Sequence, residues 1–206
     1  ISSDPVSVNY RITEGDYFGT EYFTMDDGVR IDIGGIYSEG SIDQVDSPSV
    51  IQLDDNTYRM YYEVGTDVFH NGEISPGWHR RIFTAHSTDG INWVKAGPVI
   101  GITSGPVYYP DYQYPSAIVL QDGRIRLFYS VWYTDSIDLK VKADIRSAVS
   151  SDGINFTKEG VRVDYGGSYD ELYAQMGKVY YYPDYDAYLM YYRGLSEVMG
   201  ISLKRY

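Results

Sequence analysis

Cysteine is absent from the 206 residues, which excludes disulfides, thiolate catalysis and cysteine-ligated zinc. No apolar run approaches the roughly 18 residues that a membrane-spanning helix needs. Basic residues are scarce, with 17 Lys plus Arg against 29 Asp plus Glu, and the net charge is −12. An acidic chain is repelled by nucleic-acid phosphates and by anionic lipid surfaces. We therefore expect neither a nucleic-acid partner nor a membrane partner.

Composition leaves the cellular compartment open. No signal peptide is visible, and the chain opens at Ile1 rather than at Met. We expect a processed or trimmed product whose targeting segment has been removed. A secreted or periplasmic location is favoured.

Helix signals are scarce, whereas tyrosine is unusually abundant at 24 residues. Apolar residues alternate or come in short bursts of β-branched and aromatic types, broken by Gly, Asp, Asn and Pro. These patterns are typical of strands joined by turns. The sequence predicts an all-β protein.

Two kinds of segment recur in step along the chain. The turn Ser87–Trp93 returns as Ser150–Phe156, 63 positions later (150 − 87). An aromatic strand signature appears as Tyr58–Tyr62, Ile125–Tyr129 and Tyr188–Tyr192. Self-similarity at a fixed period indicates a repeat architecture.

A third marker precedes each aromatic strand. We align Ser47–Ile51 with Tyr114–Ile118 and with a degenerate Ala174–Lys178. Four antiparallel strands in about 60–65 residues are typical of one β-propeller blade. We predict a single propeller domain over residues 1–206 with about three to four blades: a partial blade 1–44, blades 45–112 and 113–173, and a partial blade 174–206. An open ring of so few blades favours a homodimer.

The pattern resembles the five-bladed β-propeller glycosidases and phosphorylases of families 32, 43, 62, 68, 117 and 130. The resemblance rests on Asp46–Val50, Tyr58–Tyr62 and Ser87–Trp93. It implies an acidic pocket where the innermost strands converge, with one carboxylate as base, one as acid and a third that orients the substrate. It implies neither a metal nor a cofactor.

The chain departs from this family at one place. Such enzymes often carry Asp directly before the Pro of the innermost strand, whereas this chain has Ser47, Tyr114 and Ala174 at the positions we align. Asp46 comes one residue earlier. Because side chains alternate across a strand, this offset favours an Asp46 side chain that points away from the channel.

Carboxylates near the starts of the innermost strands are the catalytic candidates. We predict Asp46 and Glu171 as the acid–base pair and Asp111 as the orienting group, with Asp170 among the substrate-binding residues. Inverting glycosidases hold the acid and the base about 6.5–9.5 Å apart.

The remaining substrate-binding candidates are aromatic or basic. Trp78 and Trp132 have no counterpart in the repeat and are candidates to stack on sugars. His79 and Arg80 precede a strand and are suited to sugar hydroxyls or a product anion, and Tyr114 completes the set.

The leading function is a glycoside hydrolase-like protein that acts on or binds an oligosaccharide or polysaccharide, and we favour an enzyme. Two alternatives stay open. One is a non-catalytic carbohydrate-binding propeller, and the other is a self-associating scaffold module.

Overall fold

The computed structural model describes residues 28–32, 42–70, 73–101, 110–134, 140–167, 170–195 and 202–205. These residues form strands in antiparallel sheets, and the helical structure among them is one short 3₁₀ turn. The prediction of an all-β protein is confirmed. Of the partial blade expected over residues 1–44, residues 1–27 and 33–41 lie outside the described residues.

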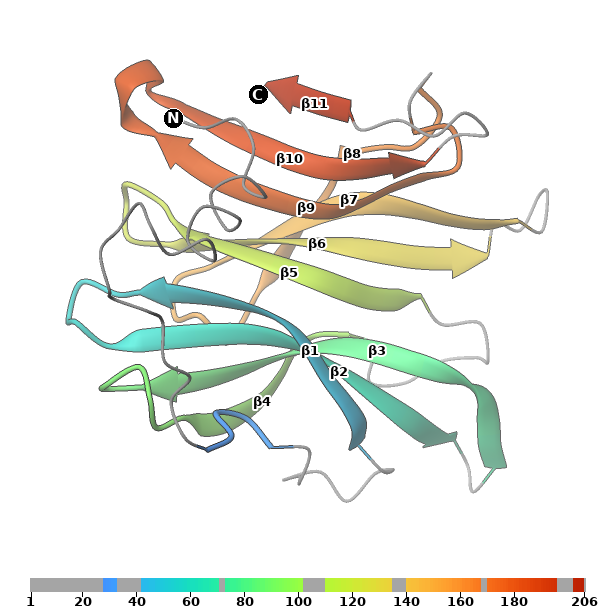
Figure 1. The fold of residues 1–206 in the computed structure, drawn as a ribbon, viewed down its shortest axis with the longest axis horizontal. Helices are drawn as coiled ribbons and strands as arrows, with labels where there is room; N and C mark the ends of the chain where they lie inside the picture. The colour runs from blue at the N-terminus through green and yellow to red at the C-terminus, as the bar shows by residue number, and fades with distance from the viewer. Residues whose placement is uncertain are drawn as a thin grey trace, which may run out of the picture.

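The strands fall into three consecutive groups, and Figure 1 shows the first group in the lower part of the view and the third at the top, with the second group between and behind them. Unit 1 is a four-stranded sheet in the order β1-β2-β3-β4. Its strands are β1 (Ile42–Gln52), β2 (Tyr58–His70), β3 (Glu73–Ser87) and β4 (Val94–Ile100).

Units 2 and 3 repeat the up-and-down pairing. Unit 2 contains β5 (Asp111–Val119), β6 (Ile125–Thr134), β7 (Val141–Ser150) and β8 (Thr157–Val163). Unit 3 contains β9 (Tyr173–Tyr182), η1 (Pro183–Tyr185), β10 (Ala187–Leu195) and β11 (Ser202–Arg205). A single parallel pair, Ala143 with Tyr173, joins β7 to β9 and makes one extended sheet of the two units.

The first strand of unit 1 begins at Ile42, before the marker Ser47–Ile51 of the repeat. A β-bulge between Asp46 and Ser49 carries Pro48, so the proline does not end the strand. Equivalent irregularities interrupt β5 between Gln113 and Ser116, and the β9–β10 pairing beside Arg193.

The core lies between the units because alternate residues of one strand face different neighbours. On β2, Tyr61 belongs to the cluster shared with unit 2, whereas Met60, Tyr62 and Val64 belong to the cluster on the other face. A third cluster joins unit 2 to unit 3 and includes Phe128, Val179 and Met190. The period of two thus buries both faces of the middle unit.

The predicted Asp-Gly turns are confirmed as equivalent turns, one between β3 and β4 and one between β7 and β8. The Asp89 carboxylate accepts the Asn92 N–H at 2.7 Å, and the Asp152 carboxylate accepts the Asn155 N–H at the same distance. These bonds hold the pKa of both carboxyls well below the ordinary value. Trp93 and Phe156, the aromatic residues that end these two segments, are half-buried.

The second turn also contacts unit 1. The Tyr61 hydroxyl donates a hydrogen bond to the Gly153 carbonyl at 3.0 Å. A Cβ added at Gly153 would lie 2.8 Å from Arg59 Nε and 3.0 Å from Ile125 Cδ1. Gly153, with φ +74°, therefore serves both the turn and the approach of two units.

Replacing Gly153 with Ala should destabilise the protein more than Gly123→Ala. Both glycines have positive φ, +74° and +80°, so each variant pays a backbone cost of roughly 1–2 kcal/mol. Nothing lies within 4 Å of a Cβ at Gly123, whereas Gly153→Ala adds an overpacking cost of about 1–3 kcal/mol. Denaturant melts measure the difference. Equal losses would mean that Arg59 moves aside freely.

Candidate functional site

The first strand of each unit carries one non-glycine residue in a left-handed conformation. These are Ser47, Tyr114 and Met176, with φ of 51°, 54° and 57°. Such backbone strain is uncommon for bulky residues and concentrates at functional sites. Because the three positions are equivalent in the repeat, they give a common reference for comparing the side chains around them. Our alignment placed Ala174 with Ser47 and Tyr114, and that placement is wrong by two residues, since Met176 stands there.

A side chain from the preceding unit satisfies the N–H of two of these strained residues. Glu63 Oε2 accepts the Tyr114 N–H at 3.2 Å, and Ser130 Oγ accepts the Met176 N–H at 2.9 Å. Glu63 and Ser130 hold the same place on β2 and β6, opposite Asp46 and Gln113 in the strand register. The same contact thus recurs between successive units.

Asp46 precedes Ser47, and its carboxylate is half-buried. Oδ1 accepts the Ser47 N–H at 2.7 Å, and Oδ2 accepts a hydrogen bond from Gln44 Nε2 at 2.9 Å. The equivalent residues of units 2 and 3 are Gln113 and Gln175, both buried. Asp46 is therefore the one acid among these three positions, and the bulge beside it interrupts the simple alternation from which we judged its direction.

Arg80 connects Asp46 to Asp111. Its guanidinium pairs with Glu63 and approaches Gln44 Oε1 at 3.4 Å. Its backbone N–H donates to Asp111 Oδ1 at 3.1 Å. A chain of contacts therefore runs from Asp46 through Gln44 and Arg80 to Asp111. Four of the predicted site residues belong to this network, namely Asp46, Arg80, Asp111 and, through its N–H, Tyr114, whereas Gln44 and Glu63 were not predicted.

Glu63 is the most deeply buried acid of the network, with 1% of its surface exposed. Burial raises the pKa of Glu63, and the Arg80 charge and the Tyr114 N–H oppose this shift. Partial burial also raises the pKa of the Tyr114 phenol, and the Glu63 carboxylate adds to it. A neighbouring carboxylate thus adds to the effect of burial on the pKa of each group, Asp46 for Glu63 and Glu63 for Tyr114.

Aromatic side chains lie beside this network. Trp132 pairs with Asp111 in the β5–β6 register, and its ring lies 4.8 Å from the ring of Tyr173. The buried Trp132 Nε1 has no hydrogen-bond partner among the described residues. Trp78 and His79 belong to β3 by their backbones, but their side chains lie outside the described part of the chain.

Asp170 and Glu171 precede β9 and differ from each other in environment. Asp170 is 2% exposed, accepts the Tyr192 hydroxyl at 2.6 Å and accepts the Gly167 N–H at 2.8 Å. These bonds tie the turn to β10. Glu171 is exposed to solvent. Neither acid is among the partners of Asp46 and Asp111 described above.

The described ranges contain neither a metal-binding cluster nor a membrane-spanning helix. No group of three or more His, Asp or Glu side chains there is arranged to hold a metal ion. None of the helical structure described is both long and apolar enough to cross a membrane.

Comparison with solved structures relates this geometry to known folds. The chain is similar to a family 117 glycoside hydrolase from the marine bacterium Zobellia galactanivorans, with a TM-score of 0.62, 19% identity, and coverage of 84% of this chain and 55% of that one. It is also similar to the Bombyx mori family 32 β-fructofuranosidase, with a TM-score of 0.58, 18% identity, and coverage of 82% of this chain and 34% of that one. A thermostable family 43 glycoside hydrolase gives a TM-score of 0.55 and 17% identity, with coverage of 78% of this chain and 54% of that one.

The chain therefore has the fold of the propeller glycoside hydrolases, as its repeat signatures predict. It spans at most about half the length of these three structures. No family model matches the sequence. No curated protein matches it either. At these identities the comparison establishes the fold, and the function rests on the residues of the site.

Replacing Glu63 with Gln should flatten the dependence of stability on pH. Because burial raises the Glu63 pKa above its ordinary value of 4.5, the folded protein keeps a proton that the unfolded chain has released. The free energy of unfolding therefore falls as the pH rises from about 4.5 through the folded-state pKa. The Glu63→Gln variant lacks this contribution, which denaturant melts at a series of pH values would measure.

The matched control is Glu171→Gln, which removes an exposed carboxylate and should keep the wild-type slope. A Glu63→Gln protein that also kept the wild-type slope would contradict the prediction. It would mean that Arg80 holds Glu63 ionised throughout the range.

Proposed function

We propose that this chain is a glycoside hydrolase-like protein that acts on or binds glycans through an acidic pocket at the starts of β1, β5 and β9. Its units are blades of a propeller, about three to four in this chain. The blades follow the predicted division into a partial blade 1–44, blades 45–112 and 113–173, and a partial blade 174–206.

One observation carries the proposal. The contact chain Asp46–Gln44–Arg80–Asp111 links carboxylates from two successive first strands, beside the left-handed residues Ser47 and Tyr114. Acid–base chemistry on a glycosidic bond needs carboxylates that are held in place by other residues. This arrangement supports Asp46 as the general base and Asp111 as the group that orients the substrate or the base.

The acid partner in this proposal is Glu171, which lies two residues before β9, whereas Asp46 lies within β1 and Asp111 begins β5. Its exposed carboxyl is free to face a bound sugar. Inversion would require a separation of about 6.5–9.5 Å from Asp46. Asp170 would then act by holding the turn that presents Glu171.

Aromatic rings would supply the sugar platform. The stacked pair of Trp132 and Tyr173 lies beside Asp111, and Tyr114 lies beside Glu63. Tyrosine and tryptophan combine an apolar ring with a polar donor, which suits the mixed surface of a sugar. Trp78 and His79 stay predicted members of the substrate-binding set.

Asp46→Asn should abolish turnover without unfolding the protein. The amide keeps the shape of the side chain but cannot accept a proton, so we expect a loss of roughly 10²–10⁴-fold on a panel of aryl glycosides. Asp184→Asn, in the exposed turn at the far end of β9, is the control and should keep full activity. Thermal melts confirm that both variants fold.

A non-catalytic carbohydrate-binding protein is the alternative that a specific observation favours, since Gln113 and Gln175 stand where Asp46 stands in unit 1. Calorimetry with oligosaccharides would then detect binding to wild type and to Asp46→Asn alike, with no turnover by either. Neither binding nor turnover, together with self-association in sedimentation, would instead indicate a scaffold module.

A further inference from the structure

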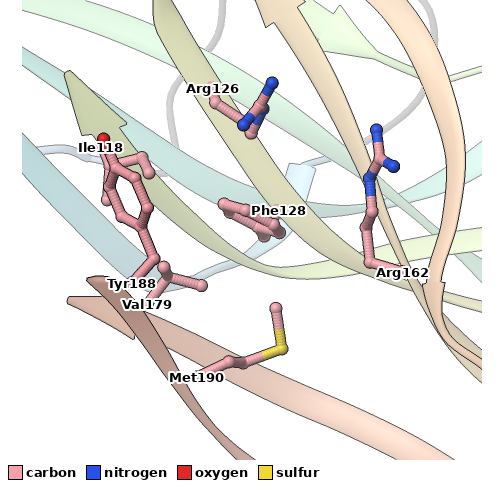
Figure 2. A pocket seen from close by; sticks show the side chains of 7 residues that line it. All are labelled: Ile118, Arg126, Phe128, Arg162, Val179, Tyr188 and Met190. Atoms are coloured by element: carbon pink, nitrogen blue, oxygen red, sulfur yellow. The ribbon is translucent and has the colours of Figure 1, made fainter. Parts of the chain in front are cut away.

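A cavity between units 2 and 3 lies apart from the candidate site. It encloses about 250 Å³ and is lined by Ile118, Arg126, Phe128, Arg162, Val179, Tyr188 and Met190. Figure 2 shows Phe128 at the centre, Tyr188, Val179 and Met190 on the side of unit 3, and the two arginines on the opposite side. The cavity therefore has an apolar body and a cationic end.

The cationic end carries more positive charge than its own acid neutralises. Arg126 binds Glu159 through two nitrogens, at 3.0 and 2.9 Å. Arg162 lies 3.3 Å from the same carboxylate and donates to Ser147 Oγ at 2.7 Å. Two guanidiniums thus share one carboxylate, which leaves a local charge of +1 in a chain whose net charge is −12.

The arginines also have unused hydrogen-bond donors. Each guanidinium has five N–H groups, and the contacts of the described residues occupy a minority of the ten. Both side chains are partly exposed, at 30% and 38%, so their remaining donors are accessible. A planar carboxylate is the anion that matches a guanidinium in geometry as well as charge.

The size of the apolar part limits the ligand. At the roughly 30 Å³ that one water molecule occupies in the liquid, 250 Å³ accommodates about eight non-hydrogen atoms. Phe128, Val179 and Met190 offer no hydrogen bonds to a sugar hydroxyl there. An unbranched acyl chain fills such a cavity and leaves its carboxylate at Arg126 and Arg162.

We propose that this cavity is a binding site for a medium-chain carboxylate of about eight carbons, held by Arg162 and Arg126 at its head and by Phe128, Val179 and Met190 along its chain. The site does not depend on the glycan function. Its ligand differs from a sugar in having a single charged end and an otherwise apolar body.

Octanoate is the probe. 1-Octanol lacks the carboxylate and tests the contribution of the charged head, whereas acetate lacks the alkyl chain and tests the contribution of the apolar body. In the full 206-residue chain with labelled methyl groups, octanoate should shift the NMR signals of Met190, Val179 and Ile118 in a saturable manner. The dissociation constant of octanol should be roughly tenfold higher than that of octanoate, because a hydrogen bond to a charged group strengthens binding by about tenfold or more. Acetate should not saturate the site.

Arg162→Gln should weaken octanoate binding roughly tenfold and leave octanol binding unchanged. Lys95→Gln removes the same charge from β4 of unit 1, where Lys95 pairs with Asp32, and should have no effect on either ligand. Octanol binding as tightly as octanoate to wild type would overturn the proposal, as would the absence of saturable shifts at these methyl groups. Both comparisons use wild type, so they decide the matter even if Arg162→Gln fails to fold.

Discussion

The structure depends on side chains that cross from one unit to hydrogen-bond the backbone of the next first strand. β1 and β5 are edge strands of their sheets. β9 pairs fully with β10 on one side, but on its other side it is joined to β7 by the single residue pair Ala143–Tyr173. Edge strands leave backbone N–H groups without a partner in the sheet. Ser49 Oγ accepts the Ala117 N–H at 3.0 Å, and Ser116 Oγ accepts the Val179 N–H at 3.1 Å. The same serine of the repeat thus protects each following edge.

The candidate site forms where the residue that makes a contact between units is an acid in unit 1 and a serine in unit 2. Ser130 provides the neutral acceptor for the left-handed residue of β9, but unit 1 uses the carboxylate of Glu63 for the corresponding residue of β5. A buried carboxylate needs a cation, and Arg80 provides it. The Arg80 backbone then binds Asp111, so one exchange of serine for glutamate is enough to gather a polar cluster around a structural contact.

Much of the fold could be predicted from local chemistry, because turns and strand periods depend on residues close in sequence. The Asp-Gly turns use bonds within three residues, and they were predicted correctly. The strand start at Ile42 was missed because Pro48 indicates a boundary unless a bulge accommodates it. The third copy was misaligned because Met176 adopts a left-handed backbone that no sequence signal marks.

The candidate site was only partly predictable for a different reason. Asp46, Asp111 and Arg80 could be chosen as polar residues near strand starts. Their connection, however, joins positions 31 and 36 residues apart, and it depends on how the units pack. Glu63 could have been noticed as a lone acid within the apolar stretch Tyr61–Val64, but its role becomes visible only through its contact with Tyr114 in the next unit.

The equivalent positions of the three units separate what the fold requires from what chemistry requires. Every first strand has the bulge and the left-handed residue, so these features serve packing and would persist in a protein without activity. The residue before the left-handed position is Asp46 in unit 1 and glutamine in the other two, and the side chain that secures the next unit is Glu63 rather than serine. Both departures place acids in unit 1, where unit 2 has the neutral Gln113 and Ser130 and unit 3 has Gln175 and the cationic Arg193. Since neither is needed to form a unit, function is the better explanation for them, and the site is to be sought where the repeat is broken rather than where it is kept.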